Sequence, residues 1–166
     1  METIEIGAVL VDMTTLEATD EFQSFIKPIR HPELTPFCTA LTSISQSMVD
    51  SAPSFPVAFE KMKDRLIKAN VETIFGSWGN YDRTQFMRDC TLHKIDYGLP
   101  PHLNLKNALS EKQRTRKRFG MARALRLCGI PLEGQHHRGI DDARNIARLL
   151  PWILGDRMLQ REQRRD

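Results

Sequence analysis

The stretch "METIEIGAVLVDMTTLEATDEFQSFIKPI", residues 1–29, decides the fold class. Ile4, Ile6 and Ala8 alternate with other residues before the fully apolar run "AVLV", a pattern typical of a β-strand. A turn through Met13–Thr19 leads to a second alternating run, "EFQSFIKPI" at 21–29. Two such runs joined by a short turn predict a β-hairpin at the start of the sequence.

Working outward from the hairpin, apolar residues recur with helical spacing. The expected elements after residue 52 are a helix over 55–69, a short strand over 71–78 ("VETIFGSW"), a helix over 80–95, two short helices over 103–113 and 120–129, and a last helix from Gly139 that Pro151 kinks or restarts. Residues 31–52 are expected to be irregular with short helical turns, because they contain several prolines. This order predicts an α/β fold in which helices flank a mixed sheet.

The composition predicts a single soluble domain. The 166 residues are 40% hydrophobic and 27% charged, without an internal repeat or a Pro/Gly-rich linker. No apolar run approaches the roughly 20 residues that cross a bilayer, and no signal sequence is present. The three cysteines, Cys38, Cys90 and Cys128, are scattered and lack a metal-binding spacing. We therefore expect a cytoplasmic protein with unpaired cysteines.

Positive charge is unevenly distributed, although the net charge is only +3. Between residues 112 and 126 the sequence contains seven basic residues and no acidic one: Lys112, Arg114, Arg116, Lys117, Arg118, Arg123 and Arg126. A second basic group closes the sequence in "RMLQREQRRD" at 157–166. Clusters of this kind indicate binding to a phosphate backbone, but a solvated helix face and a basic tail give the same pattern.

The stretch "GQHHRGIDDARNIARLLPWIL", residues 134–154, combines a core-facing helix with polar residues at its start. Asp141 and Asp142 lie where the helix dipole favours negative charge, which alone explains one of them. His137 precedes Asp142 by five residues, with Gly139 between them, so a loop histidine and a helix carboxylate can point at one site. Such a pair is what metal-assisted hydrolysis requires: the carboxylate holds a hard cation and the imidazole deprotonates water.

A second polar stretch, "FGSWGNYDRTQF" at 75–86, follows the expected strand. Asp82 lies at the start of the next helix, and the ends of strands are where α/β sheets bind ligands. Trp78 and Tyr81 offer flat rings on which a base can stack. Each residue also has a structural explanation, Asp82 as a helix N-terminal charge and Trp78 as a core residue.

Four segments together resemble the DEDDh 3′–5′ exonucleases. They are "FCTALTSISQSMVDSAPSFP" (37–56), "GSWGNYDRTQF" (76–86), "LNLKNAL" (103–109) and "GQHHRGIDDARNIARL" (134–149). The resemblance runs from Ile4 to about Leu150 and is closest to the branch of histone-mRNA and small-RNA trimming exonucleases and bacterial sporulation-inhibitor-like exonucleases. It implies an RNase H-like mixed sheet flanked by helices.

The resemblance also implies roles for single residues. Asp82 and Asp142 match metal-binding carboxylates, and His137 matches the general base. Phe37 and Trp78 match aromatic positions that hold the terminal base, with Tyr81 as an alternative to Trp78. The family uses two Mg²⁺ or Mn²⁺ ions about 4 Å apart to release nucleoside 5′-monophosphates from a 3′ end. We therefore expect single-stranded RNA or DNA as partner and no membrane.

The sequence departs from the family in its first motif. Asp-x-Glu, on a first strand that lies in the centre of the sheet, should stand about a dozen residues before "ETIEIGAVLVD" and is not present. Glu2 and Glu5 match a later strand and are not substitutes. Without the first motif, one metal loses most of its ligands, and two strand edges are left unpaired.

This departure leads to two hypotheses about the chain. The first is that the natural protein begins upstream of Met1, so residues 1–155 are one exonuclease-like domain that is N-terminally truncated relative to the family, followed by a basic tail at 156–166. The alternative is a catalytically inactive descendant that serves as a nucleic-acid-binding or interaction module.

Overall fold

The computed structural model describes residues 2–160, so the end of the expected basic tail lies outside the described residues. The chain begins with the expected hairpin, in which β1 (Glu5–Val11) pairs antiparallel with β2 (Ala18–Phe25). At the turn, the Asp12 carboxylate accepts hydrogen bonds from the backbone N–H groups of Thr14 and Thr15. The side chain thus replaces backbone partners that a tight turn leaves unsatisfied.

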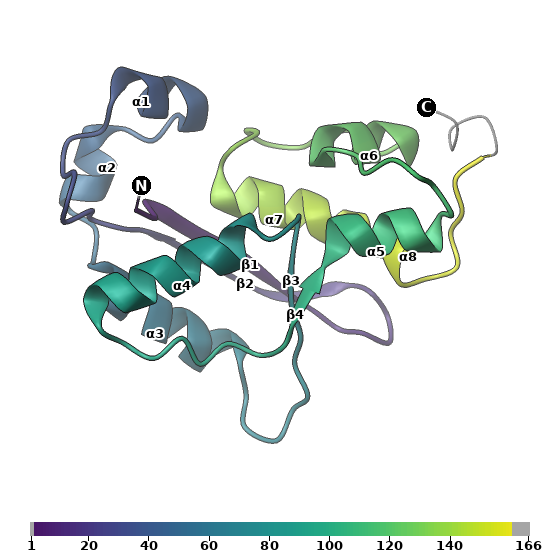
Figure 1. Ribbon diagram of the computed structural model, residues 1–166, viewed down its shortest axis with the longest axis horizontal. Helices are drawn as coiled ribbons and strands as arrows, with labels where there is room; N and C mark the ends of the chain where they lie inside the picture. Colours follow the sequence, from purple (N-terminus) through teal and green to yellow (C-terminus); the bar gives the residue numbers. More distant parts are fainter. Residues whose placement is uncertain (1, 161–166) are drawn as a thin grey trace.

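A second, parallel pair of strands follows later in the chain. β3 (Phe75–Ser77) pairs with β4 (His102–Asn104), and this pair forms no ladder with the hairpin. The described residues therefore contain two separate two-stranded sheets (Figure 1). Among residues 2–160, each strand therefore pairs on one side only.

The helices surround these strands. In chain order they are α1 (Pro36–Thr42), α2 (Gln46–Asp50), α3 (Phe55–Leu66), α4 (Tyr81–His93), α5 (Leu105–Lys112), α6 (Met121–Leu127), α7 (Gly139–Arg148) and α8 (Leu150–Ile153). The last helix starts at Gly139 as expected, and Pro151 lies in the first turn of a new helix, α8. None of the described helices has the length and apolar character needed to cross a membrane.

Two expected elements were wrong in their bounds. The strand expected over 71–78 covers only 75–77, because its partner begins at His102, directly after two prolines that carry no N–H donor. The helix expected over 103–113 starts at Leu105 instead, and Leu103 belongs to β4. Asn104 caps that helix by accepting a hydrogen bond from the Asn107 N–H.

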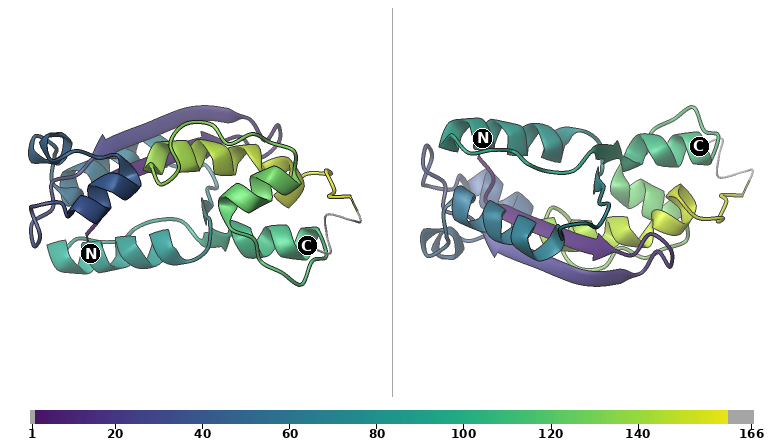
Figure 2. Two further views of the ribbon diagram at one scale, coloured as in Figure 1. Left: turned by 90° about the horizontal axis from the view of Figure 1, so that it is seen from above. Right: turned by 90° about the horizontal axis from the view of Figure 1, so that it is seen from below.

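Two apolar clusters hold these elements together. The first joins the hairpin to α3 and α4, and its buried residues are Ile6, Phe22, Ile26, Phe55, Ala58, Phe59, Met62, Leu66 and Cys90. Figure 2 shows the hairpin and α4 on opposite sides of the molecule. The second cluster joins α5, α6 and α8, and its buried residues are Leu105, Leu109, Phe119, Met121, Ala124, Leu125, Leu149, Leu150 and Ile153. Half-buried Trp78 packs against this second cluster.

Helix α7 lies directly against the first strand. A Cβ added at Gly7 would stand 2.0 Å from the backbone nitrogen of Ile140, so only glycine permits this approach. The close contact fixes where α7 begins relative to the hairpin. It thereby fixes the position of the acidic residues in the first turn of α7.

Candidate active site

The start of α7 is tied to the loop before it through a buried amide. Asn145, 1% exposed, donates to the carbonyls of Glu133 and Asp141 at 2.7 and 2.8 Å. Its side-chain oxygen accepts from the Glu133 N–H at 3.1 Å. These three hydrogen bonds hold both ends of the loop that contains the two histidines.

Asp142 organises this histidine loop. Its Oδ1 lies 3.0 Å from Nδ1 of His136, and its Oδ2 accepts the backbone N–H of His137 at 3.2 Å. The two imidazole rings stack with centroids 3.9 Å apart. One ligand atom from each of these three residues lies within 4.8 Å of the other two. The structure therefore brings His137 and Asp142 together, and it adds His136, to which the sequence analysis assigned no role.

The two adjacent aspartates have different partners. Asp141 accepts the N–H of Gln135 at 2.9 Å and pairs with Arg144 at 3.3 Å. A Cβ at Gly134 would collide with the Asp141 carboxylate, and Gly134 has the positive φ of +72° that glycine tolerates. Asp141 thus fastens the histidine loop, whereas Asp142 contacts the histidines.

A carboxylate from the hairpin also holds this loop. Glu5 accepts hydrogen bonds from Nε of Arg138 at 3.1 Å and from the Gly139 N–H at 2.8 Å, one of the N–H groups that the start of a helix leaves unpaired. The Arg138 guanidinium lies 5.2 Å from the centre of the Phe25 ring. Glu5 is therefore engaged in positioning the loop.

Glu2 is engaged as well, through three backbone N–H groups at residues 29–31. Glu2 and Glu5 thus both have structural partners.

Asp82 lies in the first turn of α4, and the charge of Asp142 affects the pKa of its carboxyl group. Desolvation raises the pKa of the Asp82 carboxyl above its ordinary value, and the negative charge of Asp142 raises it further. Hydrogen bonds from its own N–H and from Ser77 act in the opposite direction on this pKa. The ligand atoms that lie close enough to hold one cation come from Asp142, His136 and His137, and Asp82 is a further carboxylate whose pKa the charge of Asp142 raises.

The three candidate aromatic residues differ in exposure. Phe37 on α1 is 74% exposed, and Tyr81 at the start of α4 is 60% exposed. Trp78 is half-buried, and its indole N–H donates to the carbonyl of Phe119 at 3.1 Å. Tyr81 directly precedes Asp82 and Trp78 lies four residues before it, so stacking of either ring on a base stays a prediction.

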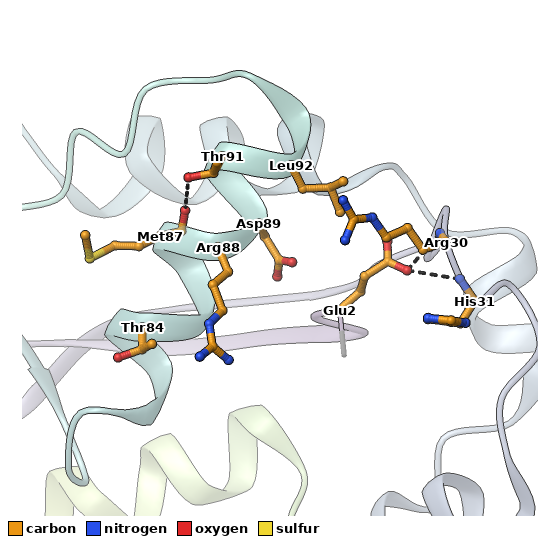
Figure 3. Close-up of a pocket in the computed structure, with 9 residues that line it drawn as sticks. All are labelled: Glu2, Arg30, His31, Thr84, Met87, Arg88, Asp89, Thr91 and Leu92. Carbon is orange, nitrogen blue, oxygen red and sulfur yellow. Dashed lines mark hydrogen bonds between the residues drawn. The ribbon is translucent and has the colours of Figure 1, made fainter.

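One cavity of the structure lies away from the predicted site. This cavity, of about 670 Å³, lies between the start of β1 and α4 (Figure 3). It is lined by Glu2, Arg30, His31, Thr84, Met87, Arg88, Asp89, Thr91 and Leu92, which include no predicted site residue. Within it, buried Asp89 accepts the Thr3 hydroxyl at 2.6 Å and so links the hairpin to α4.

Comparison with known protein families identifies the family to which this chain belongs. Residues 1–150 match the RNase_T model, whose description is Exonuclease. The chain belongs to the exonuclease family. Its most similar relatives include ERI1 exoribonuclease 3 from Homo sapiens, 33% identical over 158 residues, which cover 90% of this chain and 47% of that protein. Another is 3′-5′ exoribonuclease 1 from Homo sapiens, 31% identical over 168 residues, which cover 93% of this chain and 47% of that protein. The chain spans about half the length of these curated relatives.

Solved structures confirm the fold of this exonuclease-family chain. The nuclease domain of 3′hExo, a DEDDh family member bound to rAMP, matches with a TM-score of 0.83 and 29% identity over 94% of this chain and 84% of that chain. A 3′-exonuclease structure that concerns 3′-end recognition of the histone mRNA stem-loop matches with a TM-score of 0.80 and 29% identity over 88% of this chain and 68% of that chain. The RNase H-like fold and the resemblance to DEDDh exonucleases are therefore confirmed.

Proposed function

We propose that this chain carries a metal-dependent 3′–5′ exonuclease site, which releases nucleoside 5′-monophosphates from the 3′ ends of single-stranded RNA or DNA. The observation that carries the proposal is the cluster of His136, His137 and Asp142, whose ligand atoms lie within 4.8 Å of one another at the start of α7. The charge of Asp142 also raises the pKa of Asp82, a second carboxylate from the start of α4. The names of the relatives, which are exoribonucleases, favour RNA as the better substrate.

In this proposal each residue has a chemical role. Asp82 and Asp142 hold a Mg²⁺ or Mn²⁺ ion, which when bound neutralises the phosphate and lowers the pKa of water. His137 is exposed on its loop and accepts the proton of the water that attacks phosphorus. The 3′ oxygen of the preceding nucleotide leaves as the new phosphate–oxygen bond forms. Phe37, together with Trp78 or Tyr81, stacks on the terminal base.

The test is nucleotide release from a labelled strand. A 5′-labelled 12-nucleotide RNA and its DNA counterpart are incubated with Mg²⁺ or Mn²⁺, and the products are resolved by length. We expect shortening from the 3′ end, faster for RNA, and at least a roughly 100-fold loss in Asp82→Asn, Asp142→Asn and His137→Ala. Asp64→Asn, an exposed carboxylate on α3, is the matched control and should retain full activity. Undiminished release in all three site variants would overturn the proposal.

A second candidate is a nucleic-acid-binding module without catalysis. It is favoured by the run of seven basic residues at 112–126, which suits a phosphate backbone whether or not the strand is cleaved. Salt-dependent binding of RNA without nucleotide release would support this candidate. The decisive form of that test adds a strand with an Asp-x-Glu motif ahead of Met1, since release by the extended protein would favour the enzyme.

A further inference from the structure

Figure 1 shows the segment that joins α5 to α6. This segment and exposed positions on α6 are strongly basic. We call this region the basic surface, and its residues are Lys112, Arg114, Arg116, Lys117, Arg118, Arg123 and Arg126, all exposed. No acidic residue interrupts residues 112–126. Positive charges at this density repel one another, which disfavours the folded state unless a ligand or another function compensates.

The backbone beneath these side chains is held firmly. Gln113 is fully buried, and its amide donates to the carbonyls of Trp152 and Arg157 at 2.7 and 2.9 Å. The hydroxyl of Ser110 donates to the carbonyl of Lys117 at 3.0 Å. Arg114 adopts a left-handed conformation with φ of +54°, which is unfavourable for a residue with a Cβ. The cations are thus presented on a fixed turn.

Five cations of this surface have no ion-pair partner among residues 2–160. Elsewhere, arginines form ion pairs with carboxylates, as Arg65 does with Asp20 and Arg138 with Glu5. Within the described range, the five members of the basic surface without an ion pair are Lys112, Arg114, Arg116, Arg118 and Arg126. An anionic ligand would offset the repulsion that the fold maintains here.

The basic surface adjoins the candidate active site. Phe119 directly follows Arg118, is 3% exposed, and accepts the indole N–H of Trp78 at 3.1 Å. The guanidinium of Arg123 lies 5.4 Å from the centre of the Phe119 ring. Trp78 precedes Asp82 by four residues, so their Cα atoms are within about 14 Å. A strand leaving the site past Trp78 would meet this surface.

We propose that the basic surface binds the phosphates of the nucleic-acid strand upstream of its 3′-terminal nucleotide. This inference rests on the proposed function, in which the terminal nucleotide occupies the Asp82–Asp142 site. A nucleic-acid strand suits this surface because its phosphates form a series of negative charges that can each contact one of the basic residues. Guanidinium groups, which form most of the surface, bind phosphate through two parallel hydrogen bonds.

The experiment compares two variants with the same change in charge. In one, Arg114, Arg116 and Arg118 are replaced by Gln. In the control, three exposed lysines are replaced by Gln. Lys61 lies on α3, Lys68 follows α3, and Lys94 lies at the C-terminal end of α4. Binding of labelled oligouridylates of about 4, 8 and 16 nucleotides is measured by fluorescence anisotropy in the presence of EDTA, which prevents cleavage. The salt concentration is varied from about 25 to 200 mM, because counterion release makes the affinity depend on salt over this range.

For the arginine variant we expect a loss of roughly 10- to 100-fold in affinity for the longest RNA at low salt. The slope of log affinity against log salt should fall by about 2, because each contact to a single strand contributes about 0.7. The loss should grow with RNA length, and the lysine control should stay within about twofold of the unmodified protein.

Equal slopes for the two variants, or an equal loss for short and long RNA, would overturn the proposal. So would a wild-type protein that binds an acidic polyglutamate peptide through this surface but no RNA. Asp82→Asn serves to separate the two proposals, since it should abolish release while retaining length-dependent binding. A protein that releases no nucleotide but shows the expected slopes refutes the catalytic proposal alone.

Discussion

Glu5 and Arg138 form an ion pair across 133 residues of sequence, with side chains only 3% and 17% exposed. The pair joins β1 to the histidine loop, and the Gly139 N–H shares the same carboxylate. Because the pair is largely removed from water, loss of one partner leaves the other charge without compensation. The hairpin is thereby part of the support of the candidate site.

Glu5→Ala should therefore destabilise the protein by about 3 kcal/mol, the lower end of the range for breaking a buried ion pair. The measurement is urea unfolding followed by circular dichroism. Glu17→Ala is the control, because Glu17 is exposed and its side chain forms no ion pair among the described residues. A loss below about 0.5 kcal/mol in Glu5→Ala would contradict the structural role assigned to this pair.

Gly7→Ala should be strongly destabilising for a steric reason. The added methyl group would stand 2.0 Å from the Ile140 nitrogen, and backbone atoms cannot move aside as a side chain does. We expect a loss of about 3 kcal/mol or more in the free energy of unfolding. Gly120→Ala is the matched control, because nothing lies within 4 Å of its Cβ and its φ is −61°. Similar stabilities for the two variants would show that α7 is not seated on β1 in this way.

The sequence predicted the elements whose patterns are local. The alternation around Ile6 predicted the hairpin, Gly139 marked the start of α7, and Pro151 marked its end. The strand β4 was missed because three residues are too few to show alternation. Its last residue, Asn104, caps the next helix, so the sequence pattern assigned Asn104 to that helix.

At the candidate site, spacing placed His137 near Asp142 but did not identify the contact of His136 with the same carboxylate. That contact depends on the left-handed conformation of His137, with φ of +70°, which turns the loop back on the helix. The pairing of Glu5 with Arg138 could not be predicted either. It follows from the packing of α7 on β1 and leaves no signal in the spacing of residues.

Asp20 should titrate well below an ordinary aspartate. Hydrogen bonds from the Arg65 guanidinium, which is 2.7 Å away, and from the Glu21 N–H lower the pKa of Asp20 from 3.8 to about 2. Since the folded pKa lies below the unfolded one, the stabilisation is complete above about pH 5 and is lost as the pH falls through the folded pKa of about 2. Carbon-detected NMR of the carboxyl should report the low pKa directly. In urea unfolding, the stability difference between wild type and Asp20→Asn should shrink between pH 4 and pH 2, and a constant difference would argue against the pair.

The cysteines should differ in their reaction with iodoacetamide. Burial raises the pKa of the Cys90 and Cys128 thiols to about 11 each, so at pH 8 about one thiol in a thousand is the reactive thiolate. Cys38 lies on α1, a helix without buried residues, and is partly exposed. Mass spectrometry of the native protein should find Cys38 labelled first, with Cys90 labelled only as fast as the protein unfolds. In about 8 M urea, which unfolds a domain of this size, the three cysteines should react at similar rates. Native labelling of Cys90 at the rate of Cys38 would mean that the cluster beneath the hairpin opens readily.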